Sequence, residues 1–197
     1  MPKLDHFEII APFYERALPR RQEEQLVKLA GLPVNGILLD AGGGTGRVSR
    51  ALCEYVSQVV IVDLSLGMLA QAKANAKQGL LLACAHSERL PFPANHFERI
   101  IMVDALHHVV NQGETAGDLY RVLKPGGFLV VEEPDVQRFG VKLIALLEKL
   151  VLMRSHFLPA ERIARLFSTT GARTQIVKDE LTAWVVVEKM LNDSPKI

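Results

Sequence analysis

The sequence is dominated by short, almost wholly apolar runs that alternate with stretches of helical character. Five such runs occupy residues 36–41, 58–64, 79–85, 99–106 and 126–133. A short run without a polar face is typical of a strand buried on both sides in a parallel sheet. Residues 47–57, 65–78 and 113–123 have helical character, and Ser65 is expected to cap the second of these helices. This alternation predicts βαβ units with right-handed crossovers in a doubly wound α/β fold.

The end of the chain has a different pattern. Residues 172–180 and 181–190 contain two strand-like runs with only a short polar break between them, at the end of the first range. This pattern predicts a hairpin with at least one antiparallel strand. Because the chain has no repeat, low-complexity segment or linker, we expect one domain over residues 1–197. Within it we expect an N-terminal helical segment at 1–30 and a variable helical segment at 136–170.

Composition excludes several classes of protein. The 197 residues are 49% hydrophobic and 23% charged, which favours a folded chain with a sizeable core. A net charge of +1 provides no field to attract nucleic acid, so we expect no nucleic-acid partner. No signal-peptide core is visible and no apolar run reaches about 18 residues, so we expect a cytoplasmic protein without a transmembrane segment. Cys53 and Cys84 lack CxxC partners, so we expect reduced thiols and no metal site.

A glycine-rich stretch, ILLDAGGGTGRVSR at residues 37–50, begins within the first apolar run. A strand, a tight glycine turn and the start of a helix together form an anion or nucleotide site. Arg47 excludes two versions of this site. A phosphate-cradling GxxxxGK[ST] loop needs a lysine after its last glycine, and a GxGxxG loop started at Gly42 needs a small residue at position 47. The remaining pattern is DxGxGxG, which begins at Asp40.

This pattern resembles motif I of the class I S-adenosylmethionine-dependent methyltransferases, and later segments resemble that family in the same order. They are AHSERLPFPANHFERI at 85–100, DALHHVVN at 104–111 and LYRVLKPGGFLVVEEPD at 119–135. The last block, together with Tyr14, resembles the ubiquinone/menaquinone C-methyltransferase-like branch. The resemblance implies S-adenosylmethionine as cofactor. It also implies a Rossmann-like, mostly parallel seven-stranded sheet with a C-terminal antiparallel hairpin and helices on both faces.

The residues of the expected cofactor site follow the ends of the strands. Asp40 would act near the cofactor's ammonium group, directly or through loop amides and water. Asp63 ends the second apolar run and could accept both ribose hydroxyls, or serve as a carboxylate at a helix N-terminus. Leu64 and Met68 pack on the adenine ring or belong to the core. The expected cofactor-binding set is Tyr14, Asp40, Ala41, Gly42, Gly44, Gly46, Asp63, Leu64, Met68, His86, Ser87 and Asp104.

His86 departs from the family pattern, because the family usually has an aspartate there that accepts a hydrogen bond from the adenine amino group. A neutral histidine can accept through one ring nitrogen, whereas a protonated one cannot. Either His86 takes over this contact or the backbone around Ser87 provides it. For Tyr14, the resemblance implies a position over the cofactor carboxylate.

The catalytic candidates are His108, His107 and Glu133, which we expect at the carboxyl ends of the fourth and fifth strands, with His108 preferred. Each histidine lies either near the transferred methyl group or in a structural position. Adjacent side chains at a strand end point in different directions, so the pair is not expected to chelate a metal. A helix expected over 141–153 is apolar nearly all round, which fits a substrate lid, a homodimer interface or an ordinary buried helix.

The expected function is therefore methyl transfer from S-adenosylmethionine to a small, apolar or aromatic acceptor, with quinone-like molecules among the candidates. The chain lacks a D/N-P-P-Y/F motif and a Pro-Cys nucleophile after the fourth strand, which disfavours nucleobase methylation. One alternative is a non-catalytic S-adenosylmethionine-binding or regulatory protein of the same fold. Another is a nicotinamide oxidoreductase, against which Arg47 argues.

Overall fold

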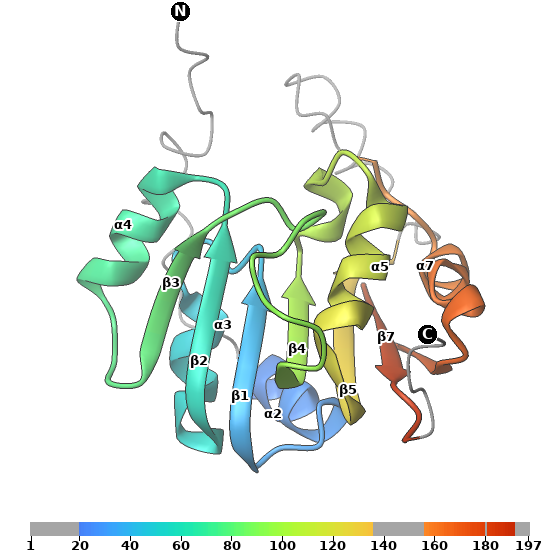
Figure 1. Ribbon diagram of the computed structural model, residues 1–197, viewed down its shortest axis with the longest axis horizontal. Coiled ribbons are helices and arrows are strands. Elements are labelled where there is room, and N and C mark those ends of the chain that lie inside the picture. Colours follow the sequence, from blue (N-terminus) through green and yellow to red (C-terminus); the bar gives the residue numbers. More distant parts are fainter. Residues whose placement is uncertain (1–19, 136–155, 180, 192–197) are drawn as a thin grey trace, which may run out of the picture.

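A single sheet with helices on both faces forms the centre of the protein in the computed structural model, which describes residues 20–135, 156–179 and 181–191 (Figure 1). Its strands are β1 (Val34–Ala41), β2 (Val56–Asp63), β3 (Leu80–Cys84), β4 (Phe97–Val103), β5 (Leu123–Pro134), β6 (Arg173–Lys178) and β7 (Thr182–Glu188). The helices are α2 (Arg20–Leu29), α3 (Arg47–Leu52), α4 (Leu66–Ala74), α5 (Gln112–Val122) and α7 (Ala160–Leu166). Short 3₁₀ turns are η2 (Cys53–Tyr55), η3 (Leu106–His108) and η4 (Ser168–Thr170).

The sheet has seven strands in the order β3-β2-β1-β4-β5-β7-β6. The first five strands are parallel to their neighbours, whereas β7 is antiparallel to both β5 and β6. The prediction of a mostly parallel, Rossmann-like sheet with a C-terminal antiparallel hairpin is therefore confirmed. The chain leaves β1 toward β2 on one side and later returns to β4 on the other. Ligands of such sheets bind at the carboxyl ends of the strands beside this reversal.

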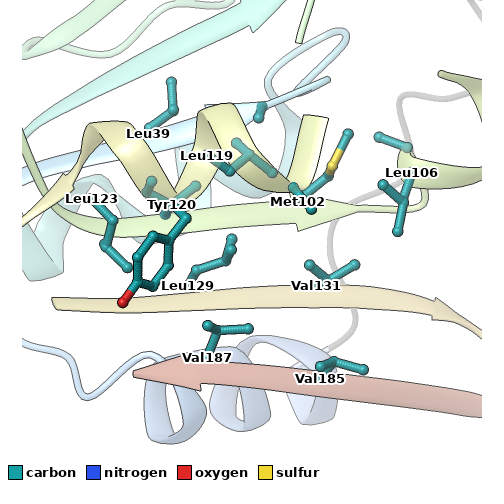
Figure 2. Packing of buried hydrophobic residues seen from close by; sticks show 14 of the residues in the cluster. Leu39, Met102, Leu106, Leu119, Tyr120, Leu123, Leu129, Val131, Val185 and Val187 are labelled. Carbon is teal, nitrogen blue, oxygen red and sulfur yellow. The ribbon is translucent and has the colours of Figure 1, made fainter. Parts of the chain in front are cut away.

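Two hydrophobic cores lie on the two faces of the sheet. Helices α2, α3 and α4 pack against one core, and α5 and α7 pack against the other. Strand β4 serves both cores, because Ile100 and Met102 face α5 while Ile101 and Val103 face the opposite side. Figure 2 shows Leu119 of α5 on the same side of the sheet as Met102. Side chains on both faces of this central strand explain why its sequence is apolar throughout.

The prediction that all five apolar runs are buried on both faces is wrong for residues 79–85. Strand β3 stands at the edge of the sheet and pairs only with β2 among the described strands. Leu81 is 51% exposed. Cys84 is also exposed, and neither it nor Cys53 forms a disulfide. An apolar edge strand has the same sequence pattern as a central one, so the pattern alone does not separate them.

The ends of several helices also differ from the expected bounds. The helix predicted over 47–57 ends at Leu52, because η2 and the start of β2 take up the remaining residues. Ser65 caps α4 as expected, with Met68 N–H donating to its Oγ at 3.4 Å. Helix α5 begins one residue early, because Asn111 Oδ1 accepts from Glu114 N at 3.1 Å and caps it.

Some predicted features lie outside the described residues. These are the first 19 residues of the N-terminal segment, which include Tyr14, and the helix expected over 141–153. Helix α2 represents the segment 1–30 in the described structure, and α7 with η4 represents the segment 136–170. In the described ranges, no helix combines the length and apolarity needed to cross a bilayer.

Candidate functional site

A cavity of about 400 Å³ opens at the carboxyl ends of β1, β2 and β4. Small-molecule sites in proteins typically measure about 300–1,000 Å³. Four segments supply its walls: the glycine turn after β1, the junction of β2 and α4, residues 85–88 after β3, and residues 102–110 at the end of β4. Predicted site residues that line it are Asp40, Gly42, Gly44, Asp63, Leu64, Met68, His86, Ser87, Asp104 and His108. Predicted residues that do not line it are Ala41, Gly46, His107 and Glu133.

Asp40 forms the floor of the cavity beneath the glycine turn. Its side chain is buried, and Ser49 Oγ donates to Asp40 Oδ2 at 2.7 Å. Burial raises the pKa of Asp40 to about 6, with Ser49 opposing and nearby Asp63 reinforcing the increase. A Cβ atom at Gly43 would lie 2.7 Å from Asp40 Cγ, so the turn can cross this carboxyl group only as bare backbone. The turn thus leaves an uncovered backbone surface above a buried acid.

Gly46 has a packing role instead of a place in the cavity wall. A Cβ atom at this position would lie 2.8 Å from Ile61 Cδ1, and its φ is +73°. Glycine therefore allows α3 to begin close against β2. A dinucleotide loop would place this small residue at position 47, whereas here the requirement is met one residue earlier. Ala41 is likewise fully buried, at the end of β1.

Asp63 connects two walls of the cavity. Its Oδ2 accepts from Gly44 N at 2.9 Å, and its Oδ1 accepts from Ser65 N at 2.8 Å. A carboxylate oxygen has more than one acceptor site, so an oxygen that accepts from a backbone N–H can also accept from a ligand hydroxyl. Leu64 is 56% exposed and Met68 is buried, and both line the cavity on this side. The arrangement places an acid and two apolar side chains together, as a nucleoside requires.

Residues 85–88 form a further wall. The His86 side chain is 64% exposed, with its Nδ1 3.8 Å from Glu88 Oε2, whereas Ser87 is buried. Glu88 Oε1 accepts from Val110 N at 3.0 Å and from Asn111 N at 3.3 Å. This carboxylate therefore ties the wall after β3 to the wall after β4.

The same segment is anchored to α5 from behind. Arg121 Nη1 donates to Phe92 O at 2.7 Å and Arg121 Nη2 donates to Leu90 O at 3.1 Å. Asp118 Oδ2 accepts from Leu90 N at 2.5 Å and also pairs with Arg121. Hydrogen bonds to α5 therefore hold residues 90–92, the L-P-F part of the sequence, in place next to the cavity wall.

Asp104 has an unusual backbone conformation at the end of β4. Its φ of +51° lies in the left-handed region, which residues other than glycine seldom adopt. Its N–H donates to Glu132 O at 3.0 Å, and the residue lines the cavity. Strained conformations of this kind cluster at functional sites.

The two histidines follow the end of β4, but their local structure and orientation differ from the prediction. They lie in the 3₁₀ turn η3, so they do not alternate as on a strand, and their ring centroids are only 3.9 Å apart. His108 lines the cavity, and burial together with the neighbouring His107 lowers its pKa to about 4. His108 is therefore a neutral imidazole at physiological pH.

His107 is buried behind the cavity wall. Its Nδ1 is hydrogen-bonded to Glu133 Oε2 at 2.6 Å, and Phe157 stacks on its other side with a centroid distance of 4.2 Å. Glu133 Oε1 also accepts from Leu106 N at 2.8 Å. This pair fixes the turn that carries His108. In the described part of the chain, no group of three or more His, Cys, Asp or Glu side chains is placed to hold a metal ion.

Glu132 is a buried acid next to the site that the sequence analysis missed. Trp184 Nε1 donates to its Oε2 at 2.8 Å, and Gln22 Nε2 of α2 donates to its Oε1. Burial raises the pKa of Glu132 to about 7, and the charge of Asp104 adds to the increase. Neighbouring residues in a strand face opposite sides of the sheet, so Glu132 and Glu133 cannot share one role. This alternation of side chains along the strand is the sequence signal by which Glu132 could have been separated from Glu133.

The raised pKa predicts a stability change with pH. A glutamate with a folded-state pKa above its unfolded value stabilises the protein at low pH, and this stabilisation is lost as the pH rises toward 7. Glu132→Gln removes the titration, and Gln22 can rotate its amide to pair with the new one. Urea unfolding should therefore show Glu132→Gln gaining roughly 2–3 kcal/mol relative to the wild type between pH 5 and pH 8. A constant difference across this range would contradict the assignment.

Known proteins with similar sequences place the chain in a family. Residues 39–131 match the family described as "Methyltransferase domain". The demethylmenaquinone methyltransferase of Tropheryma whipplei (strain Twist) is 31% identical over 189 residues, covering 94% of this chain and 74% of that protein. The ubiquinone/menaquinone biosynthesis C-methyltransferase UbiE of Coxiella burnetii (strain Dugway 5J108-111) is 36% identical over 104 residues, covering 49% of this chain and 42% of that protein.

Solved structures share the fold. The YcgJ protein of Bacillus subtilis has a TM-score of 0.76 at 17% identity, covering 87% of this chain and 99% of that chain. A SAM-dependent methyltransferase from Aquifex aeolicus has a TM-score of 0.72 at 19% identity, covering 94% and 98% respectively. At these identities the similarity concerns the fold alone.

The fold and the cavity are typical of a nucleotide-binding α/β protein, in which the ligand binds at the carboxyl ends of the strands. The chain belongs to the class I S-adenosylmethionine-dependent methyltransferases, in the branch related to the ubiquinone/menaquinone C-methyltransferases. S-adenosylmethionine is therefore its cofactor, as the sequence resemblance implied, and the nicotinamide alternative is rejected. The bare glycine turn and the acids at the cavity floor fit this cofactor, which carries two positive groups and a nucleoside.

Proposed function

We propose that the protein methylates a small, largely apolar or aromatic molecule, with quinone-like acceptors as the leading class. The main support for this proposal is the composition of the cavity wall at the end of β4. Apart from Asp104, its lining side chains are uncharged: Met102, Val103, Ala105, neutral His108, Val109 and Val110. A charged acceptor would lose hydration against these uncharged side chains, and Asp104, the charged group of this wall, is proposed below to serve the cofactor's ammonium group. Two relatives support the same class by their printed names, one a demethylmenaquinone methyltransferase and the other a ubiquinone/menaquinone biosynthesis C-methyltransferase.

The cofactor site is proposed to divide along the cavity. Asp63 would accept the ribose hydroxyls, with Leu64 and Met68 against the adenine ring. Because the His86 side chain is largely exposed, we propose that the backbone around buried Ser87 makes the adenine contact. These assignments place the nucleoside between the ends of β2 and β3.

The methionine end of the cofactor is proposed to lie across the glycine turn. Gly42 and Gly44 would contact it with bare backbone, and Asp40 and Asp104 would provide negative charge near its ammonium group. This placement leaves the opposite end of the cavity, beside His108, for the acceptor.

His108 is proposed as the group that receives the acceptor's proton. S-adenosylmethionine supplies a methyl group whose bond to sulfur breaks as the acceptor forms its own bond to the methyl carbon, with the electron pair passing to sulfur. A hydroxyl or aromatic C–H acceptor must also lose a proton, and a neutral imidazole can take it. His107 and Glu133 act only as positioning residues, because they hold the η3 turn from behind the cavity wall.

The segment 136–170 is proposed to cover the acceptor side within one domain spanning residues 1–197. Its described part returns directly to the η3 turn. His156 N donates to His107 O at 2.7 Å, and Gln112 Nε2 donates to His156 O at 2.6 Å. With the stacking of Phe157 on His107, these contacts place residues 156–157 beside the turn that carries His108.

A panel of acceptors tests this substrate class. Release of S-adenosylhomocysteine should be measured with reduced naphthoquinones and catechols, with aliphatic amines, and with RNA and DNA. We expect turnover with the apolar aromatic hydroxyl compounds and none above background with the amines or nucleic acids. Turnover confined to amines or nucleic acids would overturn the proposal while leaving the family assignment intact.

A further inference from the structure

Arg47 lines the cavity, and its side chain has no role in the site as described so far. In the sequence it served only to exclude two kinds of phosphate-binding loop. It is the first residue of α3 and lines the cavity beside the glycine turn. Within the described ranges, its guanidinium makes no hydrogen bond or salt bridge. Arg50, one turn further along the same helix, differs, because its Nη1 donates to Thr45 O at 2.7 Å and the residue does not line the cavity.

The charge of Arg47 stands out in an acidic cavity. The lining acids are Asp40, Asp63, Glu88 and Asp104, and no lysine or second arginine of the described chain lines the cavity with them. Burial raises the pKa of both Asp40 and Glu132, and the positive charge of Arg47 partly offsets this increase at each. The guanidinium therefore lies within electrostatic reach of both acids, and Arg47 lines the same cavity as Asp40.

The methionine end of the cofactor carries three charged groups of different sign. Its ammonium and sulfonium are positive and suit the acids of the cavity. Its carboxylate is negative, and among acids alone it would be repelled and deprived of its hydration. A guanidinium solves this problem, because its planar donors bind a carboxylate through two parallel hydrogen bonds.

We propose that Arg47 binds the carboxylate of the cofactor's methionine part and thereby selects adenosyl amino acids over adenosyl compounds that lack the carboxylate. This inference rests on the proposed placement of the cofactor, with its adenosine toward Asp63 and its methionine end across the glycine turn. Arg47 then determines specificity for the cofactor and has no part in the choice of acceptor.

Calorimetric titration with two ligands tests the inference without any acceptor. The ligands are S-adenosylhomocysteine and its decarboxylated analogue, which keeps the ammonium group. Loss of a charged hydrogen-bonded pair corresponds to an affinity decrease of about 10–100-fold. Arg47→Met should show this decrease for S-adenosylhomocysteine and less than about a twofold change for the analogue. Arg47→Lys should restore part of the preference, because lysine keeps the charge but not the two parallel bonds.

Arg162→Met is the matched control, because Arg162 is exposed on α7 and does not line the cavity. It should bind both ligands as the wild type does. Unchanged binding of the decarboxylated analogue shows that Arg47→Met is folded, and if that variant does not fold, Arg47→Lys carries the same comparison. An Arg47 variant with the wild-type ratio of affinities would overturn the inference alone. A wild type that binds neither ligand would overturn the proposed cofactor placement as well.

Discussion

Asp63→Ala is expected to weaken the binding of S-adenosylhomocysteine by about 100-fold, because it removes the acid that we propose to accept two charge-assisted hydrogen bonds from the ribose. Asp63 lines the cavity at the end of β2, and its two oxygens also hold Gly44 N and Ser65 N. The substitution therefore removes a ligand contact and loosens the glycine turn at the same time. Isothermal titration of the variant and the wild type at pH 7.5 measures the combined effect.

A ligand without the ribose hydroxyls separates these two causes. The wild type should prefer S-adenosylhomocysteine to its 2′,3′-dideoxy analogue, and Asp63→Ala should bind the two about equally. Glu114→Ala, at an exposed acid in the first turn of α5, should retain the wild-type preference. If Asp63→Ala keeps the full preference, the ribose assignment is wrong and the carboxylate only supports the turn.

His108→Gln is expected to lower kcat by about 100-fold, within the range for loss of a general base. Glutamine keeps polarity at the cavity wall but cannot take the acceptor's proton. Its affinity for S-adenosylhomocysteine should stay within about threefold of the wild type, because His108 lines the cavity at the end that we propose for the acceptor. His96→Gln is the matched control, since His96 precedes β4 at the opposite end of that strand. A retained kcat in His108→Gln would remove His108 from the chemistry.

The pH dependence of kcat gives a second test of His108. Because the pKa of His108 is lowered to about 4, its base form is already present at pH 5.5. With an acceptor that does not titrate in this range, kcat should be level between pH 5.5 and 7.5. A rise centred near pH 6.5, the ordinary value for histidine, would contradict a buried neutral imidazole.

The parts of the fold that depend on local pattern could be predicted from the sequence. Strand β4 is apolar because Ile100 and Ile101 face different cores, and the hairpin of β6 and β7 follows from two strand-like runs joined by a short break. The edge position of β3 could not be predicted, because it depends on which strand lies beside it and not on its own residues. Leu81 is apolar and yet half exposed for this reason.

The half of the site that we propose for the cofactor could also be predicted from the sequence, because local patterns mark its residues. Asp40 lies one residue before the end of β1 and Asp63 ends β2, and the ends of parallel strands meet at one edge of the sheet. The half that we propose for the acceptor depends on contacts between distant parts of the chain. His107 pairs with Glu133, and Glu132 of β5 pairs with Trp184 of the neighbouring strand β7. Which histidine faces the cavity depends on the 3₁₀ turn, and no local pattern predicts that turn.

Transfer of an isotopic methyl group tests the central claim most directly. The protein should be incubated with S-adenosylmethionine labelled with ¹³C in its methyl group and with a reduced naphthoquinone, and the products should be examined by mass spectrometry and NMR. We predict a labelled aromatic product formed in equal amount to S-adenosylhomocysteine, with both formed about 100-fold more slowly by His108→Gln. Binding of S-adenosylmethionine without any labelled product across the aromatic panel would contradict the claim and support a cofactor-binding protein that transfers nothing.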